Sequence, residues 1–221
     1  MNLVTWNMQG SSASTDDKWN QGILQFIKQG AEVCSLQECG SVPASAKPET
    51  PTNPLPTGVK LYTWKGSANP TKYILFYPAD PGGNRCNLAV VSVKKPKNVK
   101  LLESISSAKW RPVLGAEYDG STRYCFTIHA MSGSGNDIEG LVKAINGAVG
   151  DWVVAGDFNR QPDKITSGTP GTVCPPNGPT HPSKAPVSKY DYAIKKAASS
   201  VTGQVYQVPI LSDHLAVAFV L

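Results

Sequence analysis

Residues Trp152–Pro162 read WVVAGDFNRQP, and this stretch decides the fold. Its first four residues are wholly apolar, as in a strand that is buried on both faces. Gly156 then allows a sharp turn of the backbone. If the chain stays extended, Asp157 and Asn159 face one cleft while Phe158 enters the core. A carboxylate beside a neutral amide can position a water molecule or a metal ion and hold a phosphate oxygen. An ordinary strand-to-loop turn is the alternative, because Gly, Asp and Asn are common turn residues.

The length and composition are those of one folded domain. The chain has 221 residues, of which 17% are charged and 40% hydrophobic, as in folded rather than disordered chains. Neither a repeat nor an interdomain linker is visible, so we expect residues 1–221 to form a single domain. The net charge of +5 suits an anionic partner such as nucleic acid or a phosphoinositide without identifying one. No stretch approaches the roughly 20 apolar residues that a membrane span requires.

The first residues contain no signal peptide, because the strand-like Leu3–Trp6 follows Met1 almost at once. The chain is therefore either cytosolic or numbered from just after a removed leader.

The five cysteines form no CxxC pair, so a zinc site is not expected. Cys34 and Cys125 lie in apolar runs and are expected to be buried. An extended strand through Glu38 would hold Cys34 too far from Cys39 for a disulfide. The odd number leaves one thiol unpaired, and Cys174, in a Pro-rich loop, is the candidate for a bond to a partner chain.

Strand-like segments outnumber helical ones. β-branched and aromatic residues predict strands at Asn2–Asn7, Glu32–Leu36, Lys60–Lys65, Lys72–Tyr77, Cys86–Val93, Pro112–Tyr118, Arg123–His129, Trp152–Ala155, Tyr190–Ile194 and Leu215–Val220. Segments 41–58 and 161–189 are rich in proline and are predicted to be surface loops, and a serine-rich turn follows Gly10.

Two helices are predicted from apolar residues at helical spacing. The first covers Asp16–Gln29, and Asn136 with Glu139 forms a capping box at the start of the second. The inner face of the second helix is built by Ile138, Leu141, Val142, Ile145 and Val149. Since each helix leads into a buried strand, we predict a four-layer α/β sandwich, with two mixed or antiparallel sheets flanked by helices.

Polar side chains recur at the ends of the predicted strands, where a sandwich gathers its loops into one cleft. They are Asn7, Glu38, Arg85, Arg111, His129, Asp157, Asn159, Asp191 and the run Ser212–Asp213–His214. Two of the three histidines belong to this set, each near carboxylates, which favours acid–base chemistry over a merely satisfied histidine.

Several motifs resemble those of one family, and they occur in the order found there. They are LVTWNMQGSSAS, LQECGSVPASA, GGNRCNLAVVS, KWRPVLG, FTIHAMSGSG, VVAGDFNR, YDYAI and SDHLAVAFV. The family is that of the cytolethal distending toxin catalytic subunits (CdtB), within the deoxyribonuclease I-like endonuclease/exonuclease/phosphatase superfamily. The resemblance runs from residue 2 to 221 and is poorest in the segments 41–71 and 161–189.

This resemblance implies a role for each strand-end residue. Glu38, aided by Asn7 and Asp213, resembles the site of a divalent metal ion, with Mg²⁺ expected and Ca²⁺ or Mn²⁺ as alternatives. Asp191 resembles the carboxylate that orients His214, the expected general base. His129 resembles the second catalytic histidine. Asp157 and Asn159 resemble the groups that orient the nucleophile and the scissile phosphate. Arg85 and Arg111 resemble the arginines that bind the phosphate.

The chain also departs from the superfamily pattern. Deoxyribonuclease I pairs its first histidine with a glutamate near the region that corresponds to Lys60–Tyr77, and this region contains no acidic residue here. We therefore expect His129 to lack a carboxylate partner. The segment 161–189 is short and rich in proline, which puts DNA contacts from that loop in doubt.

The resemblance implies a metal-dependent phosphodiesterase that nicks DNA as the active subunit of a secreted genotoxin. Separate subunits would deliver the chain, with a disulfide link as one option, and the target-cell nucleus would be its place of action. A phosphoinositide phosphatase of the same superfamily is the alternative enzyme. A binding module without catalytic activity is the other alternative, although it would not need two histidines beside carboxylates.

Overall fold

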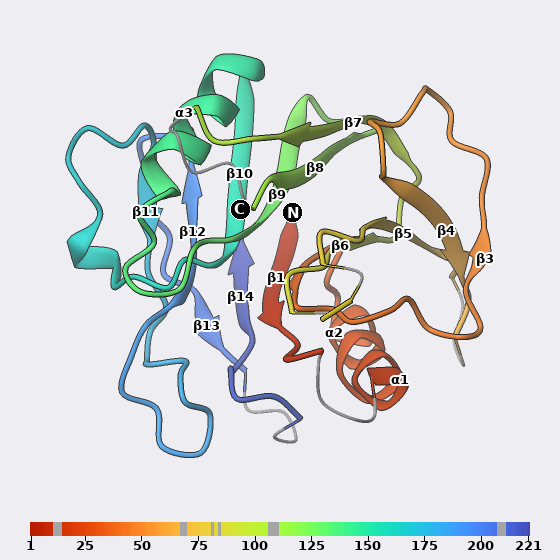
Figure 1. The fold of residues 1–221 in the computed structure, drawn as a ribbon, viewed down its shortest axis with the longest axis horizontal. Coiled ribbons are helices and arrows are strands. Elements are labelled where there is room, and N and C mark those ends of the chain that lie inside the picture. The colour runs from red at the N-terminus through yellow and green to blue at the C-terminus, as the bar shows by residue number, and fades with distance from the viewer. Residues whose placement is uncertain (11–14, 67–69, 81, 84, 106–110, 207–210) are drawn as a thin grey trace.

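The computed structural model describes residues 1–10, 15–66, 70–80, 82–83, 85–105, 111–206 and 211–221. Within these residues the strands form two sheets, as the sequence predicts (Figure 1). The eight-stranded sheet has the order β13 (Gln204–Val205), β14 (Val217–Val220), β1 (Asn2–Asn7), β2 (Val33–Gln37), β6 (Leu88–Ser92), β5 (Lys72–Tyr77), β4 (Lys60–Trp64) and β3 (Lys47–Pro48). The six-stranded sheet has the order β11 (Thr172–Cys174), β12 (Asp191–Lys195), β10 (Asp151–Asp157), β9 (Arg123–His129), β8 (Val113–Tyr118) and β7 (Pro96–Leu102).

Both sheets are mixed. The pairs β1–β2 and β9–β10 are parallel, and a helical segment connects the two strands of each pair, as parallel strands require. The other pairs are antiparallel.

Three apolar clusters account for the four layers. The inner faces of the two sheets pack together through residues such as Leu3 and Val153. On the outer face of the large sheet lie α1 (Thr15–Asp17), the π-helical η1 (Lys18–Ile23) and α2 (Leu24–Lys28), which pack through Trp19 and Phe26. On the outer face of the small sheet lies α3 (Ile138–Ala148). The predicted order of helix, sheet, sheet and helix is therefore confirmed.

The second helix begins without the predicted capping box. Asp137 is the N-cap residue, and no side chain caps the helix. Glu139 instead accepts hydrogen bonds from Arg160 (2.7 Å) and Thr166 (3.2 Å). The predicted inner face is correct for the residues inside the helix, whereas Val149 lies one position beyond its end.

Gly156 does not turn the chain, contrary to the prediction. β10 continues through it to Asp157, and a side chain at Gly156 would collide with the backbone carbonyl of Ile128 on β9. The glycine is needed for the close approach of two strands. The turn follows at Asn159, whose φ of 50° lies in the left-handed region that asparagine tolerates.

The Pro-rich segments contain short elements that the sequence did not predict. β3 lies in the segment 41–58, while the 3₁₀ turn η2 (Pro162–Lys164) and β11 lie in 161–189. β7 and β13 were also not predicted. The serine-rich turn predicted after Gly10 falls on residues 11–14, outside the described residues.

The cysteines are all free thiols. Cys34 and Cys125 are buried as predicted, and Cys34 and Cys39 form no bridge. The prediction for Cys174 is wrong, because this residue ends β11 and is fully buried. Cys86 is the one cysteine that is partly exposed.

Among the described residues, none of the helices has the length and apolar character needed to span a membrane.

Candidate active site

The register of the small sheet places three predicted site residues in one row. Asp157 on β10 lies opposite His129 on β9 and opposite Asp191 on β12. The three residues are at most 4% exposed. Because side chains alternate between the faces of a strand, this register directs all three to the same face of the sheet.

His214 joins this row from the turn before β14. Its Nδ1 forms a 2.8 Å hydrogen bond with Asp191 Oδ2, and its Nε2 lies 3.8 Å from Asp157 Oδ2. Ser212 fixes the turn, since its hydroxyl donates to the Asn7 carbonyl (2.7 Å) and accepts from the His214 backbone N–H (3.1 Å). The imidazole is thus held on one side while Nε2 faces the candidate site.

Asn7 links the ends of β1, β2 and β10. Its amide Nδ2 donates to Glu38 Oε1 (3.2 Å) and to Asp157 Oδ2 (3.0 Å), and its Oδ1 accepts the backbone N–H of Gln9 (3.0 Å). Two carboxylates from different sheets therefore converge on one amide. This oxygen-rich arrangement matches the ligands that Mg²⁺ prefers.

His129 lacks a partner on one side of its ring. Its Nε2 is 3.6 Å from Glu38 Oε1 and 3.7 Å from Asp157 Oδ2, beyond ordinary hydrogen-bond length. Its Nδ1 is buried and has no hydrogen-bond partner among the described residues. The carboxylates nearest to the ring therefore lie on its Nε2 side, and the expectation that His129 lacks a carboxylate partner stays a prediction.

The predicted phosphate-binding residues border the same cleft. The residues that line it are Glu38, Asp80, Arg85, Cys86, Arg111, His129, Ser132, Asp157, Asn159 and His214. Arg111 Nη1 and Asn159 Nδ2 both donate to the carbonyl of Ala130, at 2.8 and 2.9 Å, which holds them side by side. Asp80, which the sequence analysis did not select, accepts the backbone N–H of Arg85 (3.4 Å).

Burial of the carboxyl groups determines their protonation in the site. Burial raises the pKa of Asp157 to about 7, although the charge of His214 opposes this shift. Burial also raises the pKa of Glu38. Carboxyl groups that are costly to ionise in this way are stabilised as anions by a bound cation. The residues present therefore fit a divalent metal ion.

The two histidines carry opposite shifts. Burial lowers the pKa of His129 well below its ordinary value, with help from the positive charge of Arg111. Burial also opposes a charge on His214, but the carboxylates of Asp191 and Asp157 outweigh it and raise the pKa to about 10. At neutral pH, His129 is a neutral imidazole and His214 an imidazolium.

Asp213 does not line the cleft that Glu38 borders, but a different pocket that it shares with Gln9. Its backbone N–H donates to Gln9 Oε1 (3.2 Å), and its carboxylate Oδ2 is 4.0 Å from Nε2 of His181. His181 itself was not selected from the sequence. Its position in the Pro-rich segment before YDYAI was the available signal, since that segment leads directly into β12.

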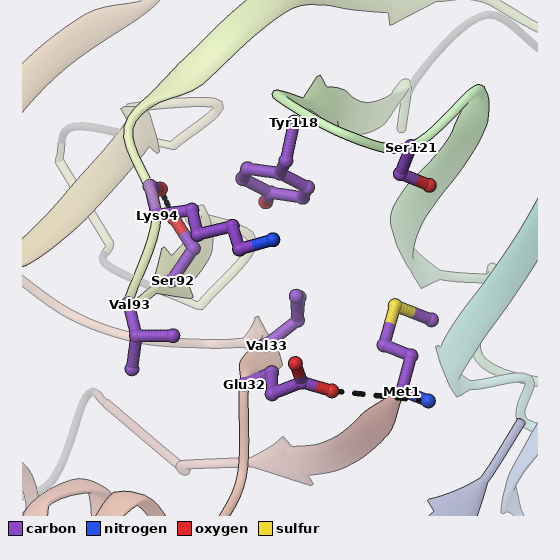
Figure 2. A pocket seen from close by; sticks show the side chains of 8 residues that line it. All are labelled: Met1, Glu32, Val33, Ser92, Val93, Lys94, Tyr118 and Ser121. Carbon is purple, nitrogen blue, oxygen red and sulfur yellow. Dashed lines mark hydrogen bonds and ion pairs between the residues drawn. The ribbon is translucent and has the colours of Figure 1, made fainter.

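A different pocket lies at the start of β1, at the opposite end of the strand from Asn7. Met1, Glu32, Val33, Ser92, Val93, Lys94, Tyr118 and Ser121 line it (Figure 2). The Glu32 carboxylate is 3.8 Å from the amino group of Met1 and accepts the backbone N–H of Asn2 (2.8 Å). This pocket contains none of the predicted site residues.

Comparison with known proteins identifies the family of this chain. Residues 4–214 match the model of the endonuclease/exonuclease/phosphatase family. The CdtB homologue of Salmonella typhi, a cytolethal distending toxin protein, is 33% identical over 98% of this chain and 88% of that protein. In the crystal structure of cytolethal distending toxin from Actinobacillus actinomycetemcomitans, the matching chain is 30% identical with a TM-score of 0.84, over 99% of this chain and 97% of that one. CdtB, described as the biologically active subunit of the toxin, is 28% identical with a TM-score of 0.83, over 99% of this chain and 96% of that one.

Proposed function

The chain belongs to the endonuclease/exonuclease/phosphatase family, and from this membership we propose that it is a divalent-metal-dependent phosphodiesterase that nicks DNA as the catalytic subunit of a toxin. Its likeness to the CdtB proteins of cytolethal distending toxins over nearly the whole chain supports the choice of substrate. One observation carries the proposal. His214, bonded to Asp191, directs Nε2 toward Asp157 in the same cleft as Glu38, His129 and Arg111.

The proposed base is His214, and Asp191 is the residue that positions it. The hydrogen bond to Nδ1 fixes the ring so that Nε2 faces the cleft, where it can take a proton from an attacking water molecule. Asp157 lies 3.8 Å from the same nitrogen and is proposed to orient the water. His214 must first lose its own proton to act as a base, and positive charge bound near Asp157 and Asp213 favours that loss.

The proposed metal ligands are Glu38, Asn7 and Asp213. Carboxylate and amide oxygens suit Mg²⁺, with Ca²⁺ or Mn²⁺ as alternatives. Such an ion, when bound, stabilises negative charge that develops on phosphate oxygens. The neutral His129, with Nε2 between Glu38 and Asp157, is proposed to donate a hydrogen bond to the phosphate or to the leaving oxygen.

Arg111, Asn159 and Arg85 are proposed to hold the phosphate. The planar guanidinium of Arg111 can bond two phosphate oxygens, and its contact with the Ala130 carbonyl keeps it beside Asn159. Arg85 approaches from the loop that Asp80 organises.

Incubation of the purified chain with supercoiled plasmid tests the proposal. We expect nicking with Mg²⁺ and none after addition of a chelator. His129→Ala, Asp157→Ala and His214→Ala should each abolish nicking while circular dichroism stays native. Asp163→Asn, which removes an exposed carboxylate outside the cleft, is the control. Nicking by all three variants within a few-fold of the wild type would refute the assignment.

Arg111 and Lys97 form a matched pair for the phosphate contact. Arg111→Ala should lower nicking by at least about tenfold, because a donor to the reacting phosphate is lost. Lys97, an exposed residue on β7, lies outside the cleft, so Lys97→Ala should change nicking far less. Equal losses in the two variants would assign Arg111 to general attraction of DNA. Initial rates of plasmid nicking at fixed Mg²⁺ provide the measurement.

We also propose that the chain is secreted, that separate subunits deliver it, and that it acts in the nucleus of a target cell. The names of the relatives, which are toxin subunits, support the existence of partner subunits.

A further inference from the structure

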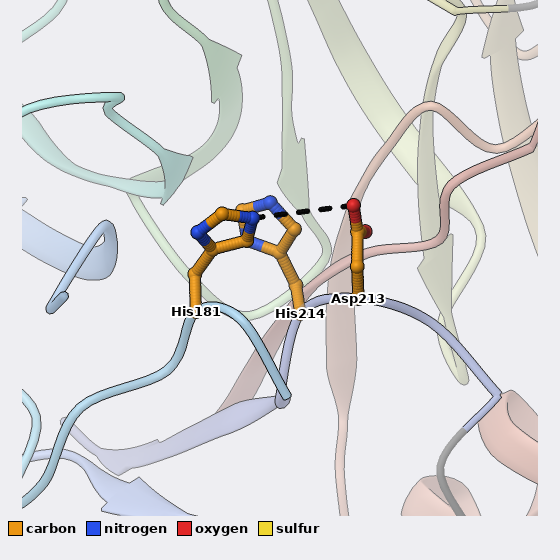
Figure 3. Close-up of side chains that lie close together, drawn as sticks. All are labelled: His181, Asp213 and His214. Carbon is orange, nitrogen blue, oxygen red and sulfur yellow. Dashed lines mark ion pairs between the residues drawn. The ribbon is translucent and has the colours of Figure 1, made fainter. Parts of the chain in front are cut away.

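The three side chains His181, Asp213 and His214 gather beside the candidate active site (Figure 3). Nε2 of His181 lies 4.0 Å from Asp213 Oδ2, and the two imidazole rings are 4.5 Å apart between centroids. One ligand atom from each residue lies within 4.8 Å of the others. His181 and Asp213 are partly exposed, so that the cluster is open to solvent.

Two loops hold this cluster together. The backbone N–H of Leu215 donates to the Thr180 carbonyl (2.8 Å), and that of Ser183 donates to the Asp213 carbonyl (2.7 Å). The Ser183 hydroxyl adds a 2.6 Å bond to the Ser212 carbonyl. These bonds join the segment that carries His181 to the turn that carries Asp213 and His214.

Contacts with residues outside the cluster also hold each histidine in place. His181 stacks on Tyr190, with 5.6 Å between ring centroids, and its backbone pairs with that of Ser188. Nδ1 of His214 is bonded to Asp191 (2.8 Å), which leaves Nε2, after loss of its proton, as the nitrogen available to a metal ion. A carboxylate behind a histidine in this way is the usual second partner of a metal-binding imidazole.

We propose that His181, Asp213 and His214 bind a Zn²⁺ ion, and that this ion inhibits the enzyme. Two imidazole nitrogens and one carboxylate are a ligand set that Zn²⁺ favours, whereas Mg²⁺ prefers oxygen ligands. This proposal departs from the expectation drawn from the cysteines, because two imidazoles and a carboxylate can bind zinc without any thiolate. The inhibition rests on the proposed function, because zinc would occupy the nitrogen of His214 that is assigned to the base.

Zinc binding can be measured without any substrate, by competition with a chromophoric zinc chelator in excess Mg²⁺. We expect one zinc ion per chain, with His181→Gln weakening the affinity at least about tenfold, since even the loss of an outer-shell partner costs that much. Asp163→Asn, on the same Pro-rich segment, should bind zinc as the wild type does. Unchanged affinity in His181→Gln, or no binding by the wild type at micromolar zinc, would overturn the site.

A measurement on the wild-type chain covers the case in which His181→Gln does not fold. In imidazole NMR spectra, zinc should shift the ring signals of His181 and His214 together and leave those of His129 in place. A shift confined to His129 and His214 would place the ion elsewhere and contradict the proposal.

Inhibition is then tested by plasmid nicking in Mg²⁺ with added zinc. Wild-type nicking should fall at micromolar zinc, while His181→Gln should keep its Mg²⁺-supported rate and resist zinc. Zinc bound at His181 without inhibition would refute the inhibitory role and leave the site standing. A chain that binds zinc but never nicks DNA would instead refute the proposed function.

Discussion

His214 shows how two neighbouring carboxylates can change the chemistry of one side chain. The pKa of about 10 lies above the ordinary histidine value of about 6.5. The ion pair with Asp191 therefore stabilises the fold fully below about pH 6.5, and this contribution is lost as the pH rises through about 10. A divalent cation bound beside Asp157 would act in the opposite direction and favour the neutral form of the ring.

Replacement of Asp191 by Asn tests this linkage. The variant should lower the free energy of unfolding by about 3 kcal/mol below pH 6.5, because it breaks a buried ion pair. The difference from the wild type should shrink as the pH approaches 10, where the wild-type ring becomes neutral. Urea unfolding at several pH values provides the measurement, and NMR should show the His214 pKa falling. A difference that does not depend on pH would contradict the ion pair.

At the scale of the strands, the site depends on a register. Strands β9, β10 and β12 place His129, Asp157 and Asp191 opposite one another, and a slip of one residue would turn Asp157 to the other face. Gly156 protects this register, since the carbonyl of Ile128 occupies the space of a side chain.

Gly156→Ala should therefore destabilise the protein by about 1–3 kcal/mol, the usual cost of overpacking, and should lower nicking by displacing Asp157. Gly147→Ala is the matched control, because a side chain there meets no atom within 4 Å and alanine favours helix α3 by up to about 1 kcal/mol. Thermal unfolding and plasmid nicking of both variants provide the test. A Gly156→Ala variant as stable and active as the wild type would show that the strands tolerate a wider spacing.

The predictability of the elements follows from their burial. β1, β5 and β9 have the predicted bounds because nearly all of their residues are buried and many are β-branched or aromatic. β7, PKNVKLL, was missed because it lies at the edge of the small sheet and is half exposed, with three lysine or proline residues among its first five. β11 was not predicted because it lies in a Pro-rich segment. There, pairing with β12 outweighs the local preference of the sequence for a loop. The π-helical turn within the first predicted helix leaves no mark on the spacing of apolar residues.

At the scale of the whole molecule, the mild net charge of +5 suits both enzymatic hypotheses, and the salt dependence of activity separates them. A nuclease binds several phosphates of a polyanion, so that its affinity falls steeply as salt rises. A phosphoinositide phosphatase holds one compact headgroup and depends much less on salt.

We expect plasmid nicking to drop sharply between low and physiological salt. Hydrolysis of a soluble inositol phosphate, assayed in parallel with Mg²⁺ over the same salt range, is the control. Efficient hydrolysis of the inositol phosphate with an untouched plasmid at low salt would exclude the nuclease hypothesis and favour the phosphatase.

The site residues that lie at strand ends could be predicted from the sequence. Glu38, Arg111, His129, Asp157 and His214 all border one cleft, since neighbouring strands end together. His181 was not predictable in this way. Its place beside His214 depends on hydrogen bonds between two loops, such as that from Leu215 to Thr180, and no periodic pattern in the sequence encodes them.

The central position of β1 also determines when the enzyme can first become active. β1 pairs with β14, and Asn7 at its end contacts the turn of Ser212, 205 positions later in the chain. A chain emerging from the ribosome therefore has an open edge at β1 until β14 has been made. Fragments that end before Ser212 would have neither the closed sheet edge nor His214, the proposed base.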